Sequence, residues 1–289
     1  MSGCWTTRRP YHWESDGTVP KLRPVQPGGE EYMALCCYFL QAMPFGTSVD
    51  RIERWESQEL YIPYAAWKSS VQKDTGMDAE EVELWLFHGT SAVDSILQGG
   101  FRSSRASLSN NRYGVGIYFA RDPRLAQYFA RPQRPAGQQE FLRTLLLARV
   151  VAGRCQTKPR VRPCDLYRPE HREPPPGWHS VTSDEMPGRE VVVFPGCPAV
   201  PAYPAYRISY QCKHTFSPYD GPLRDQLLYV DFRCREDAHV FQHYKKWYRQ
   251  HGSGSSGDPS GPPWKRPRTV PAVPVPGSRA KVSQAAPAL

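Results

Sequence analysis

The order of its apolar patterns predicts that this chain adopts an α+β fold with a mainly antiparallel β-sheet. Two helical patterns come first, and several short strand patterns follow with few helices between them. A regular alternation of strands and helices would instead predict a doubly wound parallel sheet. The 39% hydrophobic content is enough for a packed core, but 30 prolines and 22 glycines are too many for one compact domain throughout. We therefore expect a folded domain joined to loop or disordered segments.

The first part of the chain contains both helical patterns. Residues 1–29 are polar and contain several prolines without periodicity, which predicts an irregular leader. Apolar residues then recur on one helical stripe from Glu30 to Met43, and this helix ends before Pro44. Residues 48–56 alternate imperfectly as a strand does, and residues 60–71 predict a second helix.

A set of short strands begins in the next part of the chain. Residues 83–89 are an apolar run typical of a buried strand. Residues 91–97 predict a short helix that ends at Gly99 and Gly100, as expected for a helix C-terminus. The segment 102–112 is rich in serine and asparagine and predicts a loop.

The strand patterns continue beyond this loop. Residues 114–120 predict a strand, after which Asp122 caps a short helix that starts with proline. Residues 141–151 are apolar enough for a central strand. After a proline-rich loop, residues 190–194 and 206–210 complete the set.

The last part of the chain predicts little packed structure. Residues 213–250 form an appended segment with a basic, aromatic helix at 240–249, and residues 251–289, rich in proline, glycine and serine, predict a disordered tail. The net charge is +9, and the tail holds five basic residues against one acidic residue. Such a tail favours contact with nucleic acid or acidic proteins through long-range attraction. The simpler alternative is that charge keeps the tail soluble.

Cysteine spacing and the lack of long apolar runs indicate which cellular environment to expect for the protein. The eight cysteines include no C-x-x-C pair, so neither a zinc site nor a secreted disulfide framework is predicted. The N-terminus does not resemble a signal peptide, and no apolar run is long enough to span a bilayer. We expect an intracellular protein, nuclear or cytoplasmic, with no bound metal and no membrane contact.

The segment from His88 to Tyr128 carries the residue types of a binding site for a flat ligand. His88 ends a buried strand and is followed by Gly89, whose backbone N–H and C=O no side chain obstructs. Tyr118 and Tyr128 come after two closely spaced glycines and could sandwich an aromatic ring. The simpler alternatives are a buried core histidine and glycines that only form a turn.

Two charged residues belong to the same candidate site. Arg102 follows the short helix, where its guanidinium could bind a ribose or phosphate group or remain solvated. Glu190 opens an otherwise apolar strand, and a buried carboxylate is costly unless it is paired or functional. A position at the strand edge with its head in solvent is the alternative for Glu190.

Taken together, these motifs resemble the catalytic domain of the poly(ADP-ribose) polymerase family, the diphtheria-toxin-like ADP-ribosyltransferases. The resemblance covers residues 30–212, the expected catalytic domain, and implies a mainly antiparallel, split β-sheet with short helices. The matching motifs are FHGTS at 87–91, GGFR at 99–102, YGVGIYFARD at 113–122, HSVTSDEMPGREVVVF at 179–194 and YPAYRISY at 203–210.

The resemblance also implies an activity. Such an enzyme transfers ADP-ribose from NAD⁺ to a protein acceptor, which can include the enzyme itself, and releases nicotinamide. By resemblance, His88, Tyr118 and Glu190 form the catalytic triad. The residues that match NAD⁺-binding positions of the family are His88, Gly89, Thr90, Arg102, Tyr118 and Tyr128.

Two departures from the family pattern concern the nicotinamide site. The family has a serine after the first tyrosine that binds the carboxamide, and Leu125 and Ala126 occupy that stretch here. The segment from Tyr118 to Tyr128 is also one residue shorter than expected for the family.

The short region before His88 and the short cofactor loop favour mono-ADP-ribosylation. The alternatives are a catalytically weak module that binds NAD⁺ or ADP-ribose, and an interaction protein whose aromatic slot is only core.

Overall fold

The computed structural model describes residues 10, 12–102, 111–133, 141–160, 174–184, 189–194 and 200–212. The predicted appended segment at 213–250 and the predicted tail at 251–289 lie outside the described residues, and so does most of the loop that follows Arg102. The described part of the chain has the α+β architecture that the sequence predicts.

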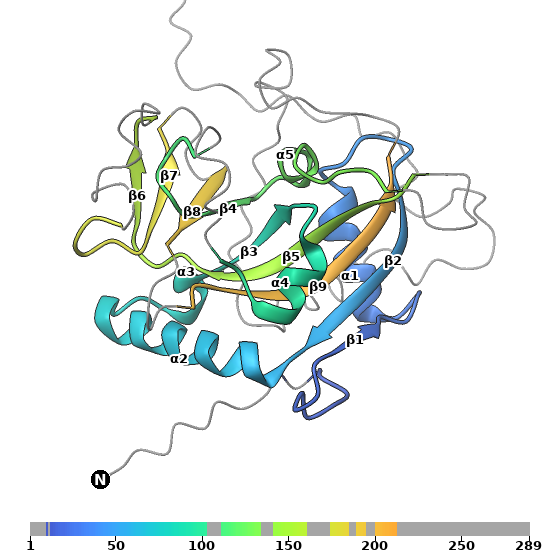
Figure 1. The fold of residues 1–289 in the computed structure, drawn as a ribbon, viewed down its shortest axis with the longest axis horizontal. Coiled ribbons are helices and arrows are strands. Elements are labelled where there is room, and N and C mark those ends of the chain that lie inside the picture. The colour runs from blue at the N-terminus through green and yellow to red at the C-terminus, as the bar shows by residue number, and fades with distance from the viewer. Residues whose placement is uncertain are drawn as a thin grey trace, which may run out of the picture.

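One sheet of nine strands forms the centre of the described structure (Figure 1). Neighbouring strands are antiparallel, except that β6 and β7 run parallel, so the predicted mainly antiparallel sheet is confirmed. In order across the sheet, the strands are β1 (Lys21–Pro24), β2 (Ser48–Glu56), β9 (Ala202–Gln211), β5 (Arg143–Val151), β3 (Glu83–Gly89), β4 (Ile117–Ala120), β8 (Glu190–Val193), β7 (Ser180–Ser183) and β6 (Cys155–Lys158).

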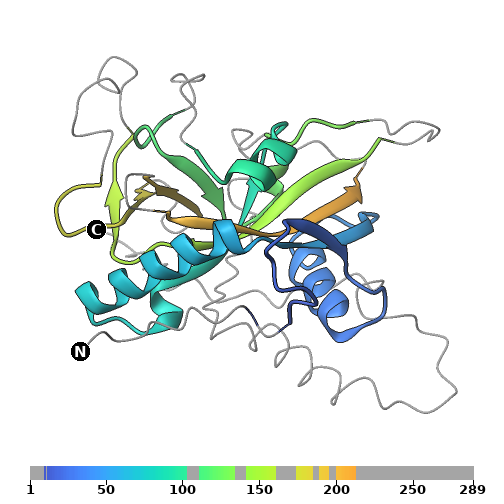
Figure 2. The ribbon, with the colours of Figure 1, turned by 60° about the horizontal axis from the view of Figure 1, so that its bottom comes forward.

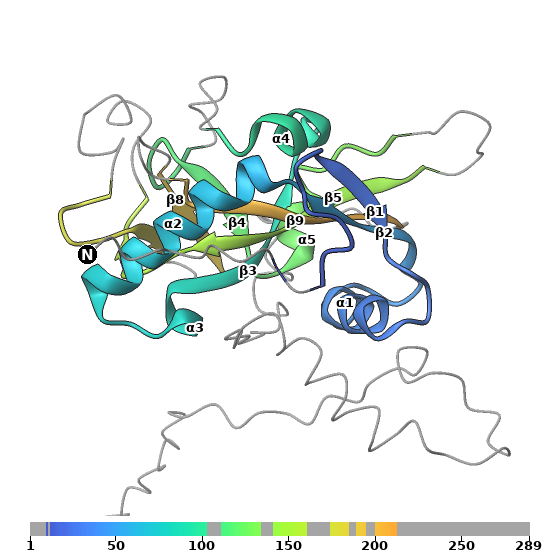
Figure 3. The same cartoon turned by 90° about the horizontal axis from the view of Figure 1, so that it is seen from below.

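Helices cover both sides of this sheet. Figures 2 and 3 place α1 and α4 on opposite sides of it. The rings of Tyr38 and Phe39 in α1 pack on Phe87 of β3, with centroid distances of 5.3 and 6.1 Å. The helices in the described residues are α1 (Glu30–Leu40), α2 (Gln58–Thr75), α3 (Ala79–Val82), α4 (Val93–Gly99) and α5 (Pro123–Gln127).

Most of the predicted elements are confirmed. β2 and β3 span the residues expected for them, and α1, α2, α4, β5, β8 and β9 differ from expectation only at their ends. Asp122 caps α5 as predicted, because its side chain accepts a hydrogen bond from the backbone N–H of Arg124. The strand expected at 114–120 is shorter, since β4 begins at Ile117.

The sequence does not predict four short elements. The expectation of an irregular leader over residues 1–29 is wrong for Lys21–Pro24, which pair with β2 as β1. The other three are α3, β6 and β7. All four are only four residues long, and their sequences KLRP, AEEV, CQTK and SVTS show no apolar period. Pairing with other strands, rather than a local pattern, accounts for β1, β6 and β7, whereas α3 begins at a capping box formed by Asp78 and Glu81.

Residues 13–15, before β1, contact the sheet and α2. Trp13 is 5% exposed and packs on Tyr61 and Tyr203, with ring centroids 5.4 and 6.1 Å away. The carboxylate of Glu56, at the end of β2, accepts hydrogen bonds from the backbone N–H groups of Glu14 and Ser15 at 2.9 Å each. This part of the leader therefore belongs to the folded core.

A buried ion pair joins β3, β5 and α2. Two guanidinium nitrogens of Arg149 lie 3.0 and 3.1 Å from the carboxylate oxygens of Glu83. From α2, Lys68 donates to the same carboxylate over 3.0 Å, and the Tyr64 hydroxyl also donates to it. Burial alone would raise the pKa of Glu83, but the charges of Arg149 and Lys68 outweigh it and lower this pKa to about 2.

The sheet is held together least at the junction of β3 and β4. These strands share one registered pair, Phe87 opposite Ala120, whereas β3 pairs with β5 along its whole length. Beyond Phe87 the two strands diverge, so His88 faces an opening between them. The split that the family resemblance implies corresponds to this junction, with β4, β8, β7 and β6 on one side (Figure 1).

Candidate active site

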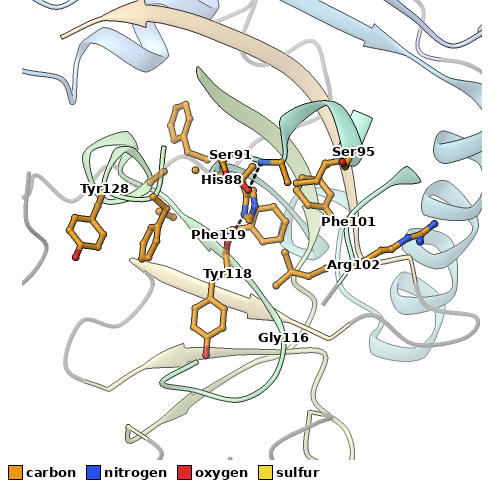
Figure 4. A pocket seen from close by; sticks show the side chains of 18 of the residues that line it. His88, Ser91, Ser95, Phe101, Arg102, Gly116, Tyr118, Phe119 and Tyr128 are labelled. Carbon is orange, nitrogen blue, oxygen red and sulfur yellow. Dashed lines mark hydrogen bonds between the residues drawn. The ribbon is translucent and has the colours of Figure 1, made fainter. Parts of the chain in front are cut away.

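A pocket of about 900 Å³ opens where β3 and β4 diverge. Its walls come from the end of β3, α4 and the residues after it, β4, α5 and the first residue of β8 (Figure 4). The structure brings every site residue expected from the sequence to this one pocket. These lining residues are His88, Gly89, Thr90, Arg102, Tyr118, Tyr128 and Glu190.

His88 stands at the centre of the pocket, in a fixed orientation (Figure 4). Its Nδ1 lies 2.8 Å from the backbone carbonyl oxygen of Tyr118, which can only accept a hydrogen bond, so Nδ1 carries a proton. Burial lowers the pKa of His88, which leaves the imidazole neutral near pH 7. Phe101 and Phe119 pack against the ring, at centroid distances of 5.2 and 5.3 Å. The free Nε2 of His88 is therefore a hydrogen-bond acceptor.

The hydroxyl of Tyr118 is engaged by the protein itself. It donates to the carbonyl of Gly114 over 2.8 Å and accepts from the backbone N–H of Tyr113 over 2.9 Å. Burial raises the pKa of Tyr118 well above its usual range, so the side chain stays neutral. What Tyr118 offers to a ligand is mainly its ring.

Glu190 enters the pocket from the first position of β8. In register it lies opposite Ala120, two residues after Tyr118, so Glu190 and Tyr118 share one face of the sheet. Burial is the largest cause of the raised pKa of Tyr118, and the negative charge of Glu190 raises this pKa further, which indicates that the two side chains are close. The hydroxyl of Thr182 donates to the carbonyl of Glu190 over 2.6 Å and fixes the start of the strand.

Two of the glycines are required by close packing. A Cβ on Gly89 would lie 1.8 Å from the carbonyl oxygen of Ala126 in α5. A Cβ on Gly116 would lie 2.6 Å from both the Val192 side chain and the Val193 carbonyl oxygen. The space beside Gly116 is thus filled by β8. Gly89 lets α5 approach β3, which sets the width of the pocket.

Other expected residues stand at the rim. In Figure 4 the ring of Tyr128 lies away from His88 and points outward, and this residue is 49% exposed. The guanidinium of Arg102 extends beyond Phe101, also away from His88 (Figure 4). The hydroxyl of Thr90 accepts the backbone N–H of Ala92 over 3.0 Å and so shapes the turn into α4.

Several lining residues are not predicted from the sequence. Asn111 is 9% exposed, and its Nδ2 is buried with no hydrogen-bond partner among the residues that the structure describes. Phe129 contacts the Tyr128 ring edge-on at 5.1 Å between centroids. Arg112 and Arg131 add positive charge to the wall. Asn111 and Arg112 end the loop at 102–112, which resembles the family's cofactor loop, whereas Phe129 and Arg131 only follow Tyr128 in the sequence.

The two residues in place of the family's serine form part of the wall. Leu125 and Ala126 both line the pocket and are 5% and 3% exposed. Neither has a side-chain group that can hydrogen-bond a carboxamide. The α5 wall of this pocket is apolar at the point where family members carry a hydroxyl.

The described part of the chain has no group of three or more His, Cys, Asp or Glu side chains placed to hold a metal ion. Among its helices, none is both long enough and apolar enough to cross a membrane.

Curated proteins with similar sequences are much longer than the region they share with this chain. Protein mono-ADP-ribosyltransferase PARP12 of Homo sapiens is 32% identical over 149 residues, and that of Mus musculus is 35% identical over 150 residues; each match covers 50% of this chain and 20% of the relative. Protein mono-ADP-ribosyltransferase PARP14 of Homo sapiens is 32% identical over 117 residues, covering 38% of this chain and 6% of the relative. This chain thus matches a fifth or less of each relative's length.

The family comparison covers the whole region that builds the pocket up to Glu190. Residues 29–190, more than half of the chain, match the model of the poly(ADP-ribose) polymerase catalytic domain. This match begins just before α1 and ends at the carboxylate that faces Tyr118. The chain therefore belongs to the poly(ADP-ribose) polymerase catalytic domain family.

Proposed function

We propose that this protein transfers a single ADP-ribose unit from NAD⁺ to a protein acceptor and releases nicotinamide. The observation that carries this proposal is the convergence of His88, Tyr118 and Glu190 on one pocket at the β3–β4 junction. Transfer of one unit is favoured by the names of the relatives, which are mono-ADP-ribosyltransferases. The acceptor can include the protein itself.

The pocket suits NAD⁺ in size and charge. Its volume of about 900 Å³ lies at the upper end of the roughly 300–1,000 Å³ usual for ligand pockets. The charged residues that line it are Arg102, Arg112 and Arg131 against Glu190. An excess of guanidinium groups favours the pyrophosphate of NAD⁺, since arginine binds phosphate oxygens with paired, charge-assisted hydrogen bonds.

Each central residue has a role in this proposal. The Nε2 of His88 accepts a hydrogen bond from a ribose hydroxyl, which the neutral tautomer described above allows. The ring of Tyr118 stacks on the nicotinamide, and the backbone of Gly89 binds its carboxamide. Tyr128 contributes its ring from the rim once the ligand is bound. Thr90 and Arg102 contact the other half of the cofactor.

Glu190 would supply the electrostatic stabilisation of the reaction. The bond from the anomeric carbon to the nicotinamide nitrogen breaks, and nicotinamide leaves with the electron pair. The ribose then carries positive charge in an oxocarbenium-like transition state, as in glycoside cleavage. A carboxylate on the same face as Tyr118 stabilises that charge. The acceptor forms the new bond to the anomeric carbon and loses a proton, which the Glu190 carboxylate can accept as a general base.

A second candidate function is favoured by one observation. Leu125 and Ala126 present an apolar wall where the family's serine binds the carboxamide. Weak retention of nicotinamide would make the protein an NAD⁺- or ADP-ribose-binding module with little transfer. The two candidates differ in whether nicotinamide is released.

Incubation of the purified full chain with labelled NAD⁺ tests the proposal. We expect label on the protein and free nicotinamide in solution. Glu190→Gln, which keeps the shape of the side chain, should lower the rate by at least about a hundredfold and leave NAD⁺ affinity nearly unchanged. Glu59→Gln, an exposed position in α2 outside the pocket, is the matched control. NAD⁺ binding without nicotinamide release would select the second candidate, and equal rates in both variants would refute the role of Glu190.

A further inference from the structure

The pocket wall beside Tyr118 is fastened by a chain of hydrogen bonds that runs through Tyr113. The backbone N–H of Tyr113 donates to the Tyr118 hydroxyl over 2.9 Å, and that hydroxyl donates to the carbonyl of Gly114 over 2.8 Å. At the other end of the chain, the Tyr113 hydroxyl lies 2.8 Å from the hydroxyl of Ser183 on β7. Tyr113 is 2% exposed and stands behind the residues that line the pocket.

The two tyrosines in this series of hydrogen bonds pack in a small hydrophobic cluster that is distinct from the main core. Tyr118 packs against the cluster, which consists of Tyr113, Val181, Val192 and Phe194. Its strand residues belong to β7 and β8. The rings of Phe101 and Phe119, on which His88 packs, belong instead to the main core. Tyr118 is therefore supported by a cluster of its own, although neighbouring residues of β4 and β8 also contribute to the main core.

Few contacts join the β3 side of the pocket to the β4 side. β3 and β4 share one registered pair, and one further hydrogen bond runs from His88 Nδ1 to the Tyr118 carbonyl. The position of the Tyr118 ring relative to His88 then depends on the pairing of β4 with β8, where Tyr118 lies opposite Val192, and on what holds residues 111–116 against β7. The hydrogen bond between the hydroxyls of Tyr113 and Ser183 is one such contact, and the packing of Tyr113 on Val181 is another.

We propose that Tyr113 and Ser183 are positioning residues for NAD⁺ binding. They hold the Tyr118 ring and the wall formed by Asn111 and Arg112 at the separation from His88 that the substrate needs. The proposal rests on the proposed function, because NAD⁺ is the substrate it assumes. The Tyr118 hydroxyl has its proton and one lone pair engaged in the chain, which leaves the ring to face the ligand.

The experiment is a double-mutant cycle read out by NAD⁺ affinity. Tyr113→Phe, Ser183→Ala and the double variant each abolish the same hydrogen bond between two hydroxyls, so all three should weaken NAD⁺ binding by a similar factor of roughly three to ten. Calorimetry on the full chain measures this affinity without turnover. In the transfer assay, KM should rise by that factor while kcat changes by less than about twofold.

Matched controls separate positioning from general loss of stability. Ser180→Ala removes a buried hydroxyl from the same strand, where it bonds the Ala152 carbonyl over 2.7 Å. Tyr203→Phe removes a buried tyrosine hydroxyl that bonds the Trp55 carbonyl over 2.6 Å, outside the pocket. Both controls should unfold at lower temperature than the unsubstituted protein and keep its NAD⁺ affinity.

Each possible result decides the proposal. Weakened binding in the three cycle variants, with both controls unchanged, supports it. Unchanged affinity in the cycle variants, or an equal loss in Ser180→Ala, would overturn it and leave the proposed function intact. Failure of the unsubstituted protein to bind NAD⁺ would overturn both.

Discussion

The imidazole of His88 is oriented by the main chain of Tyr118, across the junction where β3 and β4 part. Their hydrogen bond of 2.8 Å places the proton on Nδ1 and the lone pair on Nε2. The two residues thus depend on each other in a way that does not involve the Tyr118 ring. A change that shifts the backbone of β4 would reorient the histidine even if the Tyr118 side chain were kept.

NAD⁺ affinity should fall in acid through protonation of His88. Burial lowers the pKa of His88 below its usual value, so the neutral form is populated near pH 7 and is lost only as the pH falls through this lowered pKa. Protonation turns Nε2 into a donor and removes the acceptor for a ribose hydroxyl. Calorimetric titration with NAD⁺ between pH ~8 and ~5 checks this. His179→Gln, outside the pocket, should keep the same profile, whereas a flat profile in the unsubstituted protein would contradict the role of Nε2.

The same pKa shift predicts a change in stability. Between the lowered pKa in the fold and about 6.5 in the unfolded chain, the unfolded state binds more protons. The free energy of unfolding should therefore decrease as the pH falls from about 6.5. Denaturant unfolding of His88→Asn, compared with the unsubstituted protein, isolates this contribution. Parallel stability curves for the two proteins would contradict it.

Gly89→Ala should disrupt the seat of α5 against β3. The added Cβ would lie 1.8 Å from the Ala126 carbonyl, which is backbone and cannot rotate away. We expect a loss of at least about 2–3 kcal/mol in the free energy of unfolding, together with weaker NAD⁺ binding. Gly99→Ala is the control, because its Cβ would meet only the mobile end of the Arg102 side chain. Equal stability of the two variants would show that α5 adjusts easily.

Ala126→Ser should strengthen nicotinamide binding. It places a hydroxyl on the α5 wall where family members have one, at a lining position that is already packed against Gly89. A new hydrogen bond to the carboxamide is worth about 0.5–1.5 kcal/mol, or a factor of roughly two to ten in affinity. Competition between nicotinamide and NAD⁺ measures it. No gain would mean that this wall does not face the carboxamide.

Loss of the buried ion pair between Glu83 and Arg149 should destabilise the fold without changing the pocket. Arg149→Met leaves Glu83 with Lys68 as its only cationic partner among the described residues, and we expect a loss of about 3–5 kcal/mol. In the unsubstituted protein, the pKa of Glu83 is lowered from 4.5 to about 2. Its contribution to stability is therefore present above about pH 4.5 and is lost as the pH falls toward 2. Acid unfolding of Glu83→Gln should lack that loss.

The fold was predictable where the sequence pattern alone determines an element. The apolar run of β3 and the alternation in β2 mark strands by themselves. β7 could not be found this way, since Ser180–Ser183 is buried although it is polar. Two of its hydroxyls bond Ala152 and Tyr113, which are 28 and 70 positions away, and the third bonds Glu190 on the next strand. No local pattern encodes those partners.

The same limit applies to the site. His88, Tyr118 and Glu190 could be predicted because their motifs are local and recognisable. Tyr113 could not be predicted as a support for Tyr118, because its role depends on Ser183, seventy positions away. The contribution of Asn111 depends on burial at the end of a loop, which is likewise a property of the assembled fold.

β1 has a consequence for how this protein should be shortened in the laboratory. Sequence similarity to the family begins at residue 29, after β1, yet β1 covers the outer edge of β2. A chain cut at that boundary would expose the outer edge of β2 at Glu53–Glu56, and unpaired backbone groups there are a template for edge-to-edge association between copies. The unit that keeps this edge of the sheet covered is thus larger than the region that matches the family model.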